Sequence, residues 1–295
     1  MEYTIPKELF TKRDIDLTFM HIHNPKSAGS MFRNILKRNF KDNFGDDLPY
    51  VSYKKYDKED IRSLLYLYPF ECFTSHNYSL LSLPFDELNI IGISFVRNPI
   101  EKLLSSYFYL KNRSMTSDWH ILRNKSLDEV IDFLCANRNF HPFLLDTGQA
   151  DWILGQETQT IDPFKDYLNN GSFHLFPTER FDEVCVILET LYPTKFKDCS
   201  YTKRVNTSEK DLVISEDTLS KINKLPWLRV DNALYEMSNN YLSDLQQKIF
   251  SPNEFSTKLE DFRNRCAAQN KDSKDKRGHF NSILRKFLSN KLLTK

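Results

Sequence analysis

The 295-residue sequence has no long apolar run. No stretch approaches the roughly 18 to 20 consecutive apolar residues that a transmembrane helix needs. Glu2, Lys7 and Glu8 also interrupt the N-terminal region, where a secretory signal peptide would carry its apolar core. We therefore expect a cytoplasmic protein without a transmembrane segment.

The chain also has a small net charge and few cysteines and glycines. The 41 Lys and Arg residues nearly balance the 40 Asp and Glu residues, whereas a nucleic-acid-binding domain usually has a strong basic excess. We therefore expect no nucleic-acid partner. The five cysteines are odd in number and form no Cys-x-x-Cys pair, which indicates reduced thiols. Only seven glycines occur while 14% of the residues are aromatic, a composition typical of a packed globular protein.

Helical and strand-like patterns alternate along most of the chain, which is typical of βαβ units around a parallel sheet. The sequence thus predicts an α/β fold with a central parallel sheet flanked by helices. Residues 41–60 are charged and aromatic without a clear period, so this segment is predicted to be irregular. Strands are expected over 17–23, 70–75, 90–96 and 172–176, and helices over 30–40, 99–112, 126–136, 179–191, 228–249 and 256–268.

Residues 1–268 are expected to form one domain, followed by a polar linker over 269–278. Residues 279–295 place apolar side chains at helical spacing among basic ones, which predicts a basic amphipathic C-terminal helix. Such a helix can pack its apolar stripe on its own domain or make a peripheral contact with the inner face of a membrane. Both roles remain open at this point.

The segment His-Asn-Pro-Lys-Ser-Ala-Gly-Ser over 23–30 joins an expected buried strand to an expected helix. The first N–H groups of a helix have no intrahelical partner and lie at the positive end of the helix dipole, so a phosphate or sulfate fits there. Small residues keep the turn narrow, and a lysine adds positive charge. The sequence therefore predicts an anion-binding turn made of Lys26, Ser27, Ala28, Gly29, Ser30 and Met31.

A second candidate segment begins where an apolar run ends at Arg97. Asn98 is a suitable cap for the helix that follows, and Glu101 can complete a capping box. Arg97 is thus expected at the carboxyl end of a buried strand, where ligands bind in open α/β sheets. Lys102 and Ser105, on the helix that follows, are expected near the mouth of the same site. An arginine fork and a serine hydroxyl could together hold a second phosphate.

Both segments resemble signatures of one family. Residues 23–30 are similar to the His-Ile-Pro-Lys-Thr-Ala-Gly-Thr motif of carbohydrate sulfotransferases, in particular the heparan sulfate 2-O- and uronyl-type enzymes, although Asn24 departs from it. Residues 95–110 resemble their 3′-phosphate-binding segment. The common phosphate-loop motif, in which the lysine follows the glycine, is absent, because Lys26 precedes Gly29.

The resemblance implies a single sulfotransferase domain similar to the P-loop NTPases, in a soluble bacterial relative. It implies 3′-phosphoadenosine 5′-phosphosulfate (PAPS) as donor, adenosine 3′,5′-bisphosphate as product and no metal. The acceptor would be a carbohydrate, either a polysaccharide or a lipid-linked glycan. Arg97 and Ser105 match the residues that bind the 3′-phosphate in that family. Another segment is similar to the basic loop that closes over the cofactor and contains Lys203, Arg204 and Asn206.

Sulfuryl transfer to a hydroxyl needs a base and a group that neutralises the leaving phosphate. Lys26 is the candidate for the group that neutralises the leaving phosphate. His76 is the candidate base, because it follows an expected strand and resembles the catalytic histidine of uronyl-type enzymes. A purely structural His76 stays open, as does a carboxylate base such as Glu101.

Other interpretations also remain open. The chain could be a nucleotide or small-molecule kinase of related fold, or a non-catalytic module that binds a nucleotide or a sulfated glycan. His21 and His23 share one face of a strand, as metal ligands sometimes do, but no third ligand is evident and we expect no metal. Residues 112–125 could present aromatic and basic groups to an anionic sugar, or form a solvated loop.

Overall fold

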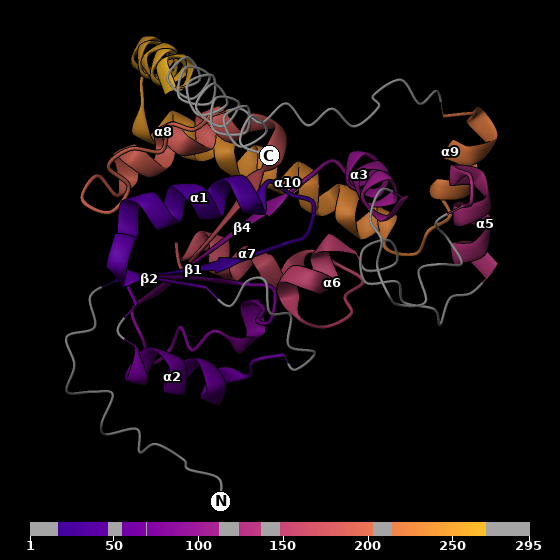
Figure 1. Cartoon of the computed structure of the whole chain (residues 1–295), viewed down its shortest axis with the longest axis horizontal. Helices are drawn as coiled ribbons and strands as arrows, with labels where there is room; N and C mark the ends of the chain where they lie inside the picture. Colours follow the sequence, from indigo (N-terminus) through magenta and orange to yellow (C-terminus); the bar gives the residue numbers. More distant parts are fainter. Residues whose placement is uncertain are drawn as a thin grey trace, which may run out of the picture. The chain divides into compact units, whose positions relative to one another are not determined.

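A five-stranded, all-parallel sheet forms the centre of the protein (Figure 1). The computed structural model describes residues 17–46, 55–68, 70–111, 124–136, 148–202 and 214–269. The sheet order is β2-β3-β1-β4-β5, and helices flank it. The α/β class predicted from the sequence is therefore confirmed. The strands are β1 (Thr18–Ile22), β2 (Phe44–Asp46), β3 (Cys72–Ser75), β4 (Ile90–Val96) and β5 (Phe173–Pro177).

Strand β1 lies at the middle of the sheet. Its last residue, Ile22, is level with Ser75 of β3 and Ser94 of β4. Because all strands run the same way, the segments that follow β1, β3 and β4 leave the sheet at one edge. That edge is where open parallel sheets bind ligands, so the fold brings the two candidate anion-binding segments and His76 to the same place.

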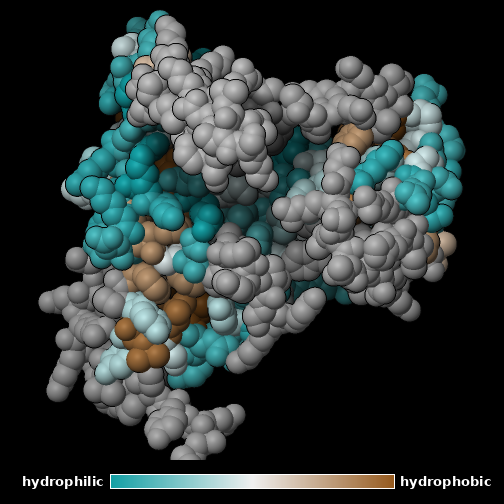
Figure 2. All heavy atoms as spheres, viewed as in Figure 1, coloured by the Kyte–Doolittle hydropathy of each residue, from teal (hydrophilic) through white to brown (hydrophobic). Residues whose placement is uncertain are grey.

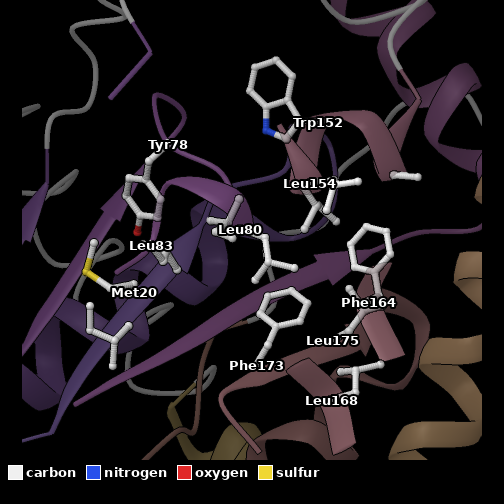
Figure 3. Packing of buried hydrophobic residues seen from close by; sticks show 14 of the residues in the cluster. Met20, Tyr78, Leu80, Leu83, Trp152, Leu154, Phe164, Leu168, Phe173 and Leu175 are labelled. Atoms are coloured by element: carbon white, nitrogen blue, oxygen red, sulfur yellow. The ribbon is translucent and has the colours of Figure 1, made fainter. Parts of the chain in front are cut away.

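The two faces of the sheet are covered by different helices (Figure 1). On one face, Phe32 of α1 (Gly29–Phe40) packs edge-on against Phe95 and His21, with ring centroids 4.8 and 4.9 Å apart. The other face carries Met20, which alternates with His21 along the strand. There Met20 joins a buried cluster that includes residues of α2 (Lys58–Leu67), α6 (Gln149–Leu154), α7 (Asp162–Asn169) and part of α10 (Leu228–Ile249). The members labelled in Figure 3 are Met20, Tyr78, Leu80, Leu83, Trp152, Leu154, Phe164, Leu168, Phe173 and Leu175.

The helices differ in length and in how clearly the residue pattern predicts them. They are α1, α2 (Lys58–Leu67), α3 (Pro99–Lys111), α5 (Leu127–Ala136), α6 (Gln149–Leu154), α7 (Asp162–Asn169), α8 (Phe181–Leu191), α9 (Glu216–Ile222), α10 (Leu228–Ile249) and a helix over 252–269, with short 3₁₀ turns η2 (Lys41–Asn43), η3 (Leu80–Ser82) and η4 (Thr178–Arg180).

All four expected strands and all six expected helices are present, with ends shifted by a few residues. The prediction that 41–60 is irregular was wrong, because this segment contains η2, β2 and the start of α2. Strand β2 has only three residues and depends on pairing with β3, so it leaves no period to read. Helices α6, α7 and α9 are also too short for a clear helical pattern.

The chain divides into two compact units, Met1–Phe181 with Thr207–Leu245, and Asp182–Asn206 with Gln246–Lys295. The whole sheet belongs to the first unit. In the second unit, the Arg265 guanidinium donates to Glu189 and Asp198. Apart from Gln269, the predicted linker over 269–278 and the C-terminal helix over 279–295 lie outside the described residues.

The described surface is mixed, with hydrophobic residues gathered near α2 on the face drawn in Figure 2. Leu67 and Tyr68, at the end of α2, are 64% and 55% exposed. None of the helices in the described ranges is long and apolar enough to cross a membrane.

Candidate functional site

The turn between β1 and α1 has an unusual backbone. Lys26 and Ala28 have φ angles of 65° and 57°, in the left-handed region that residues with a Cβ seldom adopt. In the described part of the chain, Lys41 is the other non-glycine residue with positive φ. Each such residue costs roughly 1–2 kcal/mol, and strained backbone of this kind clusters at functional sites. Two of them flank Ser27, so the turn is a candidate anion-binding nest.

Helix α1 begins after this turn without a side-chain cap. The N–H groups of Met31 and Phe32 donate to the Ala28 carbonyl at 2.9 and 3.1 Å. Within the described ranges, the N–H groups of Ala28, Gly29 and Ser30 have no hydrogen-bond partner. The predicted strand-turn-helix is therefore present. Its unpartnered N–H groups lie at the positive end of the helix dipole.

Gly29 makes room for a histidine ring. A Cβ at Gly29 would lie 1.9 Å from Cδ2 and 2.0 Å from Nε2 of His23. The sequence predicted Gly29 as one of the small residues that keep the anion-binding turn narrow. The structure adds a packing reason, because the His23 ring already fills the space that any side chain at this position would need.

Three histidine rings stack beneath the turn. The ring centroid of His23 lies 4.0 Å from that of His76 and 5.3 Å from that of His21. Burial, with a smaller contribution from the charge of His76, lowers the pKa of His21 to about 3. Burial first, then neighbouring positive charge, also holds the pKa of His23 far below its usual value. His21 and His23 are therefore neutral near pH 7.

His76 is held in one tautomer. It follows β3 directly, and its Nδ1 lies 2.6 Å from the backbone oxygen of His23. A carbonyl oxygen can only accept, so Nδ1 carries the proton and the neutral ring has its lone pair on Nε2. This is the form a general base needs at Nε2. Lys55 donates to the backbone oxygen of His76 at 3.2 Å, and its ammonium lies 3.9 Å from the ring centroid of Trp152.

Lys26 connects the turn to α3. Its ammonium lies 4.2 Å from the ring centroid of Tyr109. Ser105 precedes Tyr109 by one helical turn and so shares that face of α3. It is half-buried. Lys26 and Ser105, which the sequence assigned to different segments, are thus brought to the same side of the site.

Arg97 follows β4, as predicted, and Asn98 caps α3 by accepting from the N–H groups of Ile100 and Glu101 at 3.1 and 3.2 Å. The expected capping box does not close. Instead Glu101 accepts from the Arg97 guanidinium at 3.2 Å, while the Asn98 N–H donates to Glu179. The Arg97 and Glu101 side chains are 27% and 57% exposed. An exposed ion pair of this kind is worth about 0–1 kcal/mol, so an anionic ligand can replace Glu101 as the partner of Arg97.

Lys102 does not lie at the mouth of the site, contrary to the prediction. It is 5% exposed and lies in the electrostatic field of Asp231 and Asp151. Burial lowers the pKa of Lys102, and the two carboxylates oppose that change. The sequence could not reveal this, because the carboxylates belong to α10 and α6, far along the chain.

Gln149 is the main residue that sequence reasoning missed. It is fully buried at the start of α6. Its Oε1 accepts from the Arg97 N–H, from Asn24 Nδ2 and from Ser27 Oγ at 2.8, 3.1 and 3.2 Å. Its Nε2 donates to the Arg97 carbonyl at 2.7 Å. A lone glutamine in a short helix gives no signal in the sequence. Asn24, which departs from the sulfotransferase motif, is one of its partners.

The remaining candidates fall outside the description. Lys203, Arg204 and Asn206 lie in a part of the chain that the structure does not describe, as does most of 112–125, so their predicted roles stay predictions. No group of three or more His, Cys, Asp or Glu residues within the described ranges is arranged to hold a metal ion.

Comparison of the sequence with protein-family models and with curated proteins finds no match in either case. The residues of the site are therefore the basis on which a function is inferred.

Proposed function

We propose that the protein is a sulfotransferase that moves a sulfuryl group from PAPS to a hydroxyl of a carbohydrate. One observation carries the proposal: the two segments that resemble sulfotransferase motifs meet at one edge of the sheet. Gln149 accepts from Ser27 in the first and from Arg97 in the second. Two cationic, donor-rich segments side by side suit a nucleotide with phosphates at both ends of its ribose.

The proposed roles follow from the chemistry of each group. The N–H groups at the start of α1 bind the 5′-sulfophosphate. Lys26 neutralises the leaving phosphate, and its flexible stem lets it move from Tyr109 to that oxygen. Arg97 and Ser105 bind the 3′-phosphate. Lys26 and Arg97 supply the positive charge that the mechanism requires, so no metal ion enters the proposal.

In the transfer step, the acceptor oxygen forms a new bond to sulfur while the bond from sulfur to the phosphate oxygen breaks. The proton of the acceptor hydroxyl passes to Nε2 of His76, the nitrogen left basic by the hydrogen bond from Nδ1 to the His23 carbonyl. Adenosine 3′,5′-bisphosphate leaves. A general base of this type contributes about 10²–10⁴ in rate.

Ligand binding tests the proposal first. Adenosine 3′,5′-bisphosphate without Mg²⁺ should raise the thermal unfolding temperature of the full chain, because a ligand that binds only the native state stabilises it. Stabilisation by ATP only when Mg²⁺ is present would instead indicate a kinase. A sulfate-transfer assay with labelled PAPS, using capsular and lipid-linked glycans as acceptors, then separates an enzyme from a binding module.

Arg97→Ala should weaken binding of adenosine 3′,5′-bisphosphate by about tenfold or more, since it removes a charged, forked donor. Isothermal titration measures the affinity. Arg38→Ala, an exposed arginine in the last turn of α1, is the matched control and should bind like the parent. Equal affinity of the Arg97 variant and the parent would overturn the assignment of the 3′-phosphate site.

His76→Asn should lower turnover by about a hundredfold or more while leaving donor affinity near that of the parent. The asparagine amide can still donate to the His23 carbonyl as Nδ1 does, but it cannot accept a proton. Steady-state turnover and nucleotide titration measure the two effects separately. Turnover of the variant close to that of the parent would mean that another group is the base.

A further inference from the structure

One side chain joins the two halves of the candidate site. Gln149 lies 125 positions from Asn24 and 52 from Arg97, yet its carboxamide bonds to both. Asn24 also donates to the Phe95 carbonyl at 2.9 Å, so the turn after β1 is tied to the end of β4 as well. Every one of these contacts is buried or half-buried. Removal of one hydrogen-bonding partner would therefore leave a buried polar group without a hydrogen bond, because water does not reach it.

The backbone of Gln149 is itself fixed. Asp231 of α10 accepts from the N–H groups of Gln149 and Ala150 at 2.8 and 3.0 Å, and so caps α6 from another helix. Gly148 allows this close approach, because a Cβ there would lie 3.1 Å from Asp231 Oδ1 and 2.9 Å from Trp227 Cβ. Lys102 provides positive charge near the buried carboxylate. The carboxamide is thus presented from a rigid base.

We propose that Gln149 is a positioning residue that holds the β1–α1 turn and the segment after β4 as one preorganised unit, so that a ligand with two anionic groups binds across both. Preorganisation raises affinity because less conformational entropy is lost on binding. The identity of the ligand as a nucleotide bisphosphate rests on the proposed function, whereas the coupling between the two segments does not.

Amide hydrogen exchange tests the coupling directly. The Arg97 N–H donates to Gln149 Oε1, so Gln149→Met should speed its exchange by about tenfold or more. Ser238→Ala is the control, because the Ser238 hydroxyl is buried and bonds within α10 to the Tyr235 carbonyl. That variant should leave Arg97 exchange within about twofold of the parent. Unchanged Arg97 exchange in Gln149→Met would overturn the proposal.

Nucleotide selectivity distinguishes positioning from a general loss of stability. We expect Gln149→Met to lower the affinity for adenosine 3′,5′-bisphosphate by about tenfold more than the affinity for adenosine 5′-monophosphate. A purely structural defect would weaken both nucleotides in parallel, and that outcome contradicts the proposal. If the parent binds neither nucleotide, the proposed function fails, while the exchange measurement still decides the coupling.

A measurement on the parent protein covers the case in which Gln149→Met does not fold. Inorganic sulfate is titrated in, and exchange is followed at the Met31 and Arg97 amides, which donate to the Ala28 carbonyl and to Gln149 in the folded protein. If the two segments open as one unit, sulfate should slow both amides by factors that agree within about twofold. Slowing at Met31 alone, at Arg97 alone or at neither would contradict a coupled anion-binding unit.

Discussion

Replacement of Gly29 by alanine should destabilise the protein through a single clash. The new Cβ would lie 1.9 Å from Cδ2 of His23, whereas unstrained carbon atoms lie about 3.5 Å apart, so the ring must move by about 1.5 Å. It has little room to do so. His23 is 5% exposed, and its ring centroid lies 4.0 Å from that of His76 and 5.3 Å from that of His21.

The magnitude follows from two opposed effects. Overpacking of a buried site costs about 1–3 kcal/mol. Alanine is favoured over glycine inside a helix by up to about 1 kcal/mol, and Gly29 is the first residue of α1. We therefore expect Gly29→Ala to lower the free energy of unfolding by about 1–2 kcal/mol, measured from urea unfolding followed by circular dichroism.

A double-mutant cycle identifies the cause. In the background of His23→Ala the ring is gone, so the destabilisation by Gly29→Ala should disappear or change sign. Ser30→Ala, at the next and exposed position, is the control and should change stability by about 0.5 kcal/mol or less. The reasoning is refuted if Gly29→Ala is as stable as the parent, or if its effect is equally large without the His23 ring.

Two further predictions concern stability. Burial lowers the pKa of His21 to about 3 and of His174 to about 4, and lowers that of His23 further, so the unfolded chain binds more protons below its histidine pKa of about 6.5. Stability should therefore fall as the pH drops from about 6.5 toward 4, by about 2 kcal/mol per histidine at about pH 5. Asp231, whose pKa burial raises to about 6, offsets about 1 kcal/mol of this loss of stability. Equal urea midpoints at about pH 7 and pH 5 would contradict the prediction. Ala28→Gly should raise the free energy of unfolding by about 1 kcal/mol, because φ is 57° there; a less stable variant in the same urea assay would mean that the turn is not strained.

Local patterns in the sequence determined much of the fold. Central parallel strands are buried on both faces and read as apolar runs, as β4 does over Ile90–Val96. The cap of α3 could be predicted because Asn98 bonds only two and three residues ahead. The β1–α1 turn is equally local, so the sequence alone placed the strand end, the small residues and Lys26 in order.

The tertiary structure decided how these pieces meet. The sequence could not show that His23 stacks on His76, that Lys102 is buried near Asp231 or that Gln149 bridges the Asn24 and Arg97 segments. These contacts join residues 52 to 129 positions apart. Each depends on strand order and on short elements such as β2 and α6, which form only when the rest of the sheet and core is present. A hydrophobic period or a cap acts within a few residues, whereas a buried polar partner is chosen by packing in three dimensions.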